Sequence, residues 1–239
     1  MLLMMLERGE NVTDIVFFDT GWEFPAMYDH LEKVEKFTGR VITRLKPREP
    51  FDYLLAYKKS KTGRIGGWPH VTRRWCTKEK VMAIERYEKA LTHIHALPIV
   101  SCIGFAADEQ SRSTNHVNKN KETDYMQFSF PLVEYAVREA QALEYCYKRG
   151  FDWGGLYKVF DRVSCFCCPL GGISRARKIW RHFPELWERM LHMERGLPDD
   201  KKIRRYINEL SLSDLQSRFV AEDSLPLFES VTNSNRLES

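Results

Sequence analysis

The order of apolar and polar positions predicts strands that alternate with helices in the first half of the chain. Residues 14–19 form an apolar run between two acids, with no polar alternation, as in a strand of a buried parallel sheet. Residues 25–38 carry apolar side chains at helical spacing, and Gly39 follows as a helix stop. The same patterns predict a helix over 77–91 and two further strands over 40–45 and 97–105.

This alternation predicts an α/β fold, a parallel sheet with helices on both faces, in which ligands bind at the carboxyl ends of the strands. Beyond residue 130 the pattern changes to helices, over 132–149, 174–196 and 201–219. We therefore expect an α/β core over residues 1–130 and a helical extension over 131–220. The Ser-, Glu- and Asn-rich residues 221–239 are expected to be a flexible tail.

Composition places the chain among soluble globular proteins, with 43% hydrophobic and 29% charged residues among 239. No apolar run approaches the roughly 20 residues that a bilayer-spanning helix needs. The opening Met1–Leu6 segment lacks a basic lead and is typical of a helix face rather than of a signal peptide. We therefore expect a cytoplasmic protein with no membrane partner.

The net charge of +4 is unevenly distributed. Residues 36–80 contain thirteen Lys and Arg against three acidic residues, a net charge of +10. This segment predicts an anionic partner, whether a nucleotide phosphate, a sulfate or a nucleic acid. The alternative is a solvated basic face without a ligand.

The six cysteines favour metal binding or reactive thiols, because a reducing compartment disfavours structural disulfides. Cys76 follows two arginines, Arg73 and Arg74, whose guanidinium groups favour the thiolate and can hold a phosphate or sulfate. Lys80 adds to this positive field. Cys76, Arg74 and Lys80 are therefore the catalytic candidates, against the alternative of a basic helix start with an incidental cysteine.

A second cysteine motif, Cys165-Phe166-Cys167-Cys168-Pro169, is the strongest local signal in the chain. Cys165 and Cys168 have the C-x-x-C spacing that lets two thiolates reach one metal ion or cluster. With Cys76 as a third ligand, the fourth position is left for Cys167, a water or an exogenous sulfur species. A cluster with an open iron can carry sulfide, whereas a zinc ion closed by Cys167 would only join the two segments.

Two predicted strand ends carry further candidates. Gly21 lets the backbone approach a ligand, while Asp19 and Thr20 offer hydrogen bonds to a ribose or an amino group. The second strand end repeats this arrangement with Gly104, Asp108 and Glu109. The alternative at each end is a plain strand-to-helix turn.

Several segments, taken in order, resemble the phosphoadenosine phosphosulfate (PAPS) reductase family, and most closely its phage and bacterial defence-associated branch, which includes DNA phosphorothioation enzymes. The likeness runs from about Val12 to Trp187 and rests on residues 16–25, 74–77, 103–109, 131–135 and 164–169. It implies an adenine nucleotide α-hydrolase-like (HUP) fold with ATP, PAPS or adenosine 5′-phosphosulfate (APS) across the strand ends.

The resemblance also implies roles for the site residues. Asp19, Thr20 and Gly21 would line the nucleotide pocket, with Gly104 on its other wall and Asp108 and Glu109 beside it. Cys76, Cys165 and Cys168 would hold the iron–sulfur cluster that some members carry, here a 4Fe–4S cluster, with zinc as the alternative metal. The implied activity is sulfonucleotide reduction with a thiol reductant, or sulfur transfer from a sulfur donor.

Two departures from the family pattern bear on activity. The pyrophosphate loop Ser-Gly-Gly-Lys-Asp-Ser would precede the first helix, and the sequence opens inside that helix, so residues 1–130 would be a truncated nucleotide-binding core. No cysteine follows Cys168, whereas the reductases carry a catalytic Glu-Cys-Gly near their end. This favours sulfur transfer after substrate adenylation. The alternatives are a non-catalytic nucleotide- or nucleic-acid-binding module with structural zinc, and an inactive fragment.

Overall fold

The computed structural model describes residues 1–57, 66–95, 98–119 and 122–224. Contacts divide the chain into two compact units, the first formed by residues 1–51 and 71–166 and the second by residues 52–70 and 167–239. The boundary expected near residue 130 lies inside the first unit. Most of the predicted tail, and the basic residues 58–65, lie outside the described residues.

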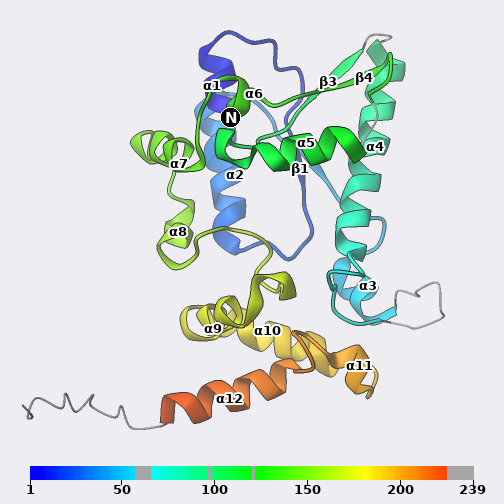
Figure 1. The fold of residues 1–239 in the computed structure, drawn as a ribbon, viewed down its shortest axis with the longest axis vertical. Helices are drawn as coiled ribbons and strands as arrows, with labels where there is room; N and C mark the ends of the chain where they lie inside the picture. Colours follow the sequence, from blue (N-terminus) through cyan, green and yellow to red (C-terminus); the bar gives the residue numbers. More distant parts are fainter. Residues whose placement is uncertain (58–65, 96–97, 120–121, 225–239) are drawn as a thin grey trace, which may run out of the picture. The chain divides into compact units, whose positions relative to one another are not determined.

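The first unit contains two pairs of parallel strands (Figure 1). Strand β1 (Val16–Phe18) pairs with β2 (Thr43–Leu45), and β3 (Ile99–Cys102) pairs with β4 (Met126–Ser129). Parallel pairing confirms the predicted α/β class, although the described strands form two two-stranded sheets rather than one. Sequence analysis did not predict β4, because only Met126 and Phe128 supply apolar side chains in this short segment.

Helices connect and cover these strands. Helix α2 occupies the predicted residues, Pro25–Thr38, and α4 (Trp75–His95) contacts both β1 and β3. The helix predicted over 132–149 is instead interrupted, because Ala136 adopts a left-handed conformation with φ 55°. The remaining helices of this unit are α1 (Leu2–Glu7), α5 (Gln110–Lys119), α6 (Pro131–Glu134), α7 (Glu139–Lys148) and α8 (Leu156–Val159).

Aromatic side chains form the core beneath the end of β1. The ring of Trp22 lies 5.1 Å from Phe51 and 5.7 Å from Trp75, both in edge-to-face geometry, and all three residues are buried. Such ring pairs stabilise beyond the area that they bury. Because Trp75 is the first residue of α4, this packing fixes the beginning of that helix at the end of β1.

The second unit is helical, which confirms the predicted helical C-terminal region. The helix expected over 174–196 is divided, because Pro184 lacks the amide hydrogen that would continue it. The helix expected over 201–219 is also divided, by a turn at residues 207–210 in which Asn208 has φ 54°. The helices are α3 (Phe51–Tyr57, whose first residue belongs to the first unit), α9 (Gly172–His182), α10 (Pro184–Arg195), α11 (Lys201–Arg204) and α12 (Leu212–Ser224).

A buried carboxylate joins two of these helices. Glu194, near the end of α10, accepts hydrogen bonds from the backbone amides of Leu212 (2.6 Å) and Ser213 (3.2 Å). These amides begin α12 and have no carbonyl partner within their own helix. Glu194 therefore caps α12. Among the described helices, none combines the length and the apolar character needed to cross a membrane.

Candidate functional site

The end of β1 forms a tight turn that satisfies its own polar groups. Asp19 accepts hydrogen bonds through Oδ1 from the amide of Gly21 (2.9 Å) and from the hydroxyl of Tyr28 (2.7 Å). Gly21 has φ +72°, a conformation that glycine adopts without strain. Asp19 therefore holds the turn in shape, and its carboxylate orients the following residues.

Next to this turn, a cluster of three polar side chains contains the first candidate cysteine of the second motif. The hydroxyl of Thr20 donates to Glu23 Oε1 at 2.7 Å, and Cys165 Sγ donates to the same oxygen at 3.6 Å. Cys165 Sγ also lies 3.7 Å from Thr20 Oγ1. The structure thus brings Cys165 to the strand end predicted to bind a ligand, although 145 positions separate it from Thr20.

Glu23 is a functional candidate that sequence reasoning missed. Burial raises the pKa of its carboxyl group, while hydrogen bonds from Thr20 and Cys165 and the charge of Lys80 act in the opposite direction. Lys80, a predicted catalytic residue, is therefore near enough to act on the cluster electrostatically. The signal in the sequence was an acid just after the Asp-Thr-Gly turn, in an otherwise apolar Trp-Glu-Phe-Pro stretch.

Trp22 connects this cluster to both cysteine segments. Its ring packs against Trp75, which precedes Cys76, and its carbonyl accepts the amide hydrogen of Phe166, which follows Cys165, at 3.0 Å. The segments that carry Cys76 and Cys165 are therefore both fixed to the turn after β1. Arg74 precedes α4 and, like Lys80, is exposed.

The second strand end is connected to the same cysteine loop. Glu109 Oε1 accepts hydrogen bonds from Arg112 Nη1 (2.5 Å) and from Arg162 Nη2 (2.7 Å). Asp108 Oδ1 accepts the amide hydrogen of Glu139, the first residue of α7, at 3.0 Å. Both predicted carboxylates at this end are thus engaged with protein donors. The two arginines were not predicted.

Gly104 lies against the N-terminal residue. A Cβ atom placed on Gly104 would be 3.6 Å from Met1 Sδ, an ordinary van der Waals contact. An alanine side chain would therefore fit here beside Met1. The predicted role of Gly104 as a wall of the nucleotide pocket stays a prediction.

The four candidate metal ligands are divided between the two units. Cys76 and Cys165 belong to the first unit, whereas Cys167, which is fully buried, and Cys168 belong to the second. Within residues 1–57, 66–95, 98–119 and 122–224, no three Cys, His, Asp or Glu side chains are grouped to hold a metal ion. Three thiols suit an iron–sulfur cluster chemically. To join one, Cys165 would have to exchange its contacts with Thr20 and Glu23 for an iron atom.

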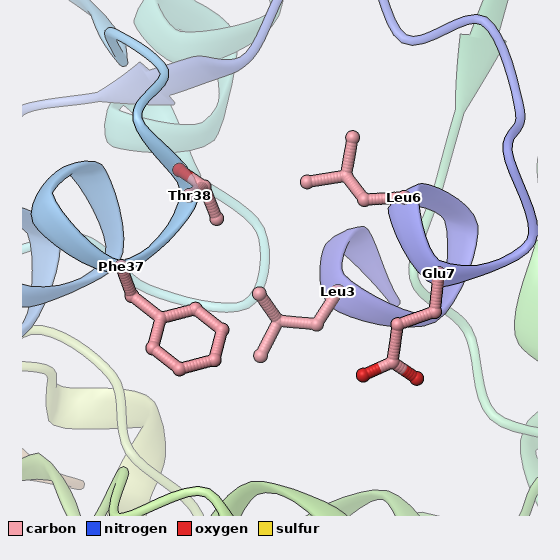
Figure 2. Close-up of a pocket in the computed structure, with 5 residues that line it drawn as sticks. All are labelled: Leu3, Leu6, Glu7, Phe37 and Thr38. Atoms are coloured by element: carbon pink, nitrogen blue, oxygen red, sulfur yellow. The ribbon is translucent and has the colours of Figure 1, made fainter.

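A shallow hollow of about 250 Å³ lies elsewhere in the first unit. Figure 2 shows Leu3 of α1 and Phe37 of α2 pointing toward one another, with Leu6, Glu7 and Thr38 around them. The lining mixes apolar and polar side chains and contains none of the predicted site residues. This hollow is therefore separate from the candidate site at the strand ends.

Comparison with known proteins identifies the family. The model of the phosphoadenosine phosphosulfate reductase domain matches residues 1–170, which contain both strand ends and all four candidate cysteines. The chain therefore belongs to the phosphoadenosine phosphosulfate reductase domain family. The family and the α/β fold expected from the sequence are confirmed.

The chain is also similar to individual relatives. An uncharacterised protein of Methanocaldococcus jannaschii is 27% identical over 192 residues, which cover 79% of this chain and 37% of the relative. A second protein of that organism is 21% identical, over 81% of this chain and 44% of the relative. An adenosine 5′-phosphosulfate reductase of Geobacillus sp. (strain WCH70) is 26% identical, over 70% of this chain and 66% of the relative. No solved structure matches the chain significantly.

Proposed function

We propose that this chain performs adenine-nucleotide-dependent sulfur chemistry, either reduction of a sulfonucleotide or transfer of sulfur to an acceptor. One observation carries the proposal: the loop formed by residues 160–166 is bonded to both strand ends. Cys165 contacts Thr20 and Glu23, and Arg162 contacts Glu109. Parallel α/β folds bind their ligands at the carboxyl ends of strands, which supports a role for this thiol in the proposed reaction.

The nucleotide is proposed to be ATP, PAPS or APS. Similarity to an adenosine 5′-phosphosulfate reductase favours the sulfonucleotides. It would lie across the ends of β1 and β3, beside Thr20, Gly21 and Gly104, with Cys76, Arg74 and Lys80 as the catalytic residues. The charge of Lys80 acts to lower the pKa of Glu23, which supports the place of Lys80 in this set. We place the reaction in the cytoplasm, as expected from the sequence, because a reducing compartment keeps thiols available for sulfur chemistry.

Isothermal titration with APS and with ATP tests the nucleotide site. We expect the wild-type chain to bind an adenine nucleotide, and Thr20→Val to weaken that binding roughly tenfold, since a hydroxyl that organises the site is lost. Thr92→Val is the matched control. The Thr92 hydroxyl donates to the Lys89 carbonyl near the C-terminal end of α4, the end opposite to Cys76. Equal affinities of Thr20→Val and wild type would contradict the assigned pocket.

Absence of binding to every adenine nucleotide would contradict the proposed function as a whole. In that case binding of single-stranded DNA with a steep salt dependence would favour the second candidate, a non-catalytic nucleic-acid-binding module. The net charge of +10 on residues 36–80 is the observation that favours this candidate. Such a binding module would need no thiol chemistry. Any zinc ion that it held would have a structural role.

We further propose a 4Fe–4S cluster held by Cys76, Cys165 and Cys168, with zinc and Cys167 as the alternative. Anaerobic purification followed by iron analysis and visible absorbance tests this assignment. We expect iron and a visible iron–sulfur band in the wild type, both lost in Cys76→Ser and Cys168→Ser. Cys102→Ser is the control, since Cys102 lies on β3 outside the cysteine motifs. One equivalent of zinc without iron would contradict the cluster.

A further inference from the structure

The side chains at the end of β1 offer a ligand hydrogen-bond acceptors rather than donors. The Thr20 hydroxyl donates its hydrogen to Glu23 Oε1 at 2.7 Å, and its oxygen accepts the amide hydrogen of Trp22 at 3.0 Å. A hydroxyl has one hydrogen and two lone pairs. Because the hydrogen is used by Glu23, the Thr20 side chain can offer a ligand only a lone pair.

Two carboxylates beside this hydroxyl each use one oxygen for protein donors. These oxygens are Asp19 Oδ1 and Glu23 Oε1, each of which accepts two hydrogen bonds. Within the described part of the chain, the second oxygens, Asp19 Oδ2 and Glu23 Oε2, take part in no hydrogen bond or salt bridge. Both side chains are partly exposed, so a ligand can reach these acceptors.

The charges around Glu23 also disfavour an anionic ligand group at this position. Burial is the largest influence on the pKa of Glu23 and raises it, and the charge of Asp19 raises it further, while the charge of Lys80 lowers it. Asp19 and Glu23 are therefore close enough to interact, and one lysine acts on this pair of acids. A group that carries hydrogens and no negative charge suits such surroundings, because like charges repel at short range.

A ribose with free 2′ and 3′ hydroxyls has this chemistry. Its two hydroxyls lie on adjacent carbons and can donate to two neighbouring oxygens. Acids in dinucleotide-binding α/β folds bind ribose hydroxyls in this way, and an arginine accommodates the phosphate where the ribose is phosphorylated. A 3′-phosphate would remove one donor and bring a further negative charge beside Asp19 and Glu23.

We propose that Thr20 and Glu23 bind the ribose hydroxyls of the nucleotide, and that Glu23 thereby selects APS or ATP over PAPS, whose ribose carries a 3′-phosphate. The inference rests on the proposed nucleotide function and narrows its substrate to nucleotides with an unphosphorylated ribose. It places Glu23, which was not predicted from the sequence, in direct contact with the ligand.

Isothermal titration with APS and with PAPS tests this selection. We expect the wild type to bind APS about tenfold more tightly than PAPS, because the phosphate replaces a hydrogen-bond donor and meets a carboxylate. Glu23→Gln keeps the shape of the side chain and removes its charge, so most of this preference should disappear. Glu32→Gln is the matched control, since it makes the same change in charge at an exposed position of α2 and should keep the preference.

A second set of ligands identifies the group that Glu23 binds. We expect 3′-deoxy-ATP to bind the wild type about tenfold more weakly than ATP does, and this difference to shrink in Glu23→Gln. Inosine 5′-triphosphate (ITP) keeps the ribose and replaces the adenine amino group by an oxygen atom. The ratio of ATP to ITP affinity should therefore be the same in both proteins, and a change confined to this ratio would place the amino group against Glu23 instead.

Several results would overturn the selection while nucleotide binding itself stands. These are equal affinities of the wild type for APS and PAPS, full retention of the preference in Glu23→Gln, or its loss in Glu32→Gln. Retained APS binding shows that Glu23→Gln is folded, and the ligand comparisons in the wild type decide the matter where it is not. Failure of the wild type to bind any adenine nucleotide would contradict the proposed function, and this inference with it.

Discussion

At the scale of single residues, the acids of the site have two kinds of partner. Some hold other protein groups in place, and one contacts a candidate cysteine. Asp19 holds the turn after β1 through Gly21 and Tyr28, and Glu109 holds two arginines. Glu23, which was not predicted, touches the candidate cysteine directly. The type of residue at a strand end was therefore predictable, whereas its partner depended on segments far away in the sequence.

His30 provides a residue-scale test of the packing around α2. Burial, and then the charge of Lys33, lower its pKa from 6.5 to about 4, against the opposing influence of Asp152. Its ring stacks on Trp153 at a centroid distance of 4.8 Å. The folded chain therefore binds the His30 proton less tightly than the unfolded chain does. The stability that this histidine contributes is complete above pH 6.5 and is lost as the pH falls toward about 4.

We expect His30→Phe, which keeps a ring against Trp153, to reduce this pH dependence. Between pH 7 and pH 5 the wild type should lose on the order of 1 kcal/mol more unfolding free energy than the variant, after allowance for solvent screening at a half-buried position. Urea denaturation at the two pH values measures the difference. Parallel losses in both proteins would show that His30 does not contribute.

At the scale of elements, the turn before α8 contains three consecutive residues with positive φ. Trp153, Gly154 and Gly155 follow one another with φ values of 50°, 59° and 79°. This turn packs on the first turn of α2, where a Cβ atom on Gly154 would lie 2.8 Å from Ala26 Cβ. The turn leads directly into α8 and the cysteine loop, so its geometry determines how that loop reaches the strand ends.

Alanine substitutions at the two glycines separate backbone strain from steric contact. Gly155→Ala should cost about 1 kcal/mol, because its φ is left-handed and the nearest atom, Lys158 Cδ, is 3.8 Å away. Gly154→Ala should cost roughly 2–4 kcal/mol, because overpacking against Ala26 is added. Denaturant unfolding of the two variants measures both losses.

A second substitution tests the steric contribution to the stability loss of Gly154→Ala. Ala26→Gly removes the atom that the new Cβ would meet, so the Gly154→Ala/Ala26→Gly double variant should lose less than the sum of its single variants. Equal losses at Gly154 and Gly155, or strict additivity in the double variant, would show that α2 and the turn are not in the contact described here.

Element boundaries followed the sequence where a local residue sets them. Helix α2 spans the predicted residues because Pro25 suits the first position of a helix and Gly39 suits the position after the last. Pro184 likewise begins α10 and so divides it from α9. The sequence prediction missed this boundary because the apolar periodicity of residues 174–196 continues across it. The left-handed conformation of Ala136 carries no such signal, whereas that of Asn208 carries a weak one, because asparagine adopts this region more often than most residues do.

At the scale of the whole molecule, the chain belongs to the phosphoadenosine phosphosulfate reductase domain family and consists of two compact units. The boundary between these units falls inside the cysteine motif of residues 165–168, between Phe166 and Cys167. Cys165 is bonded to the β1 end in the first unit, and Tyr206 is near Cys167 and Cys168 in the second. The chain spans 37% and 44% of the length of the two Methanocaldococcus jannaschii relatives.

The sequence by itself determined the α/β class, the family, the helical C-terminal region and the two strand ends as candidate sites. These follow from hydrophobic periodicity, residue order and local turn chemistry, which are read over short windows. Only the tertiary structure decided that Cys165 meets Glu23 and that Arg162 meets Glu109. Contacts between residues separated by tens of positions depend on how the elements pack, and the same side chains in another packing would face other partners.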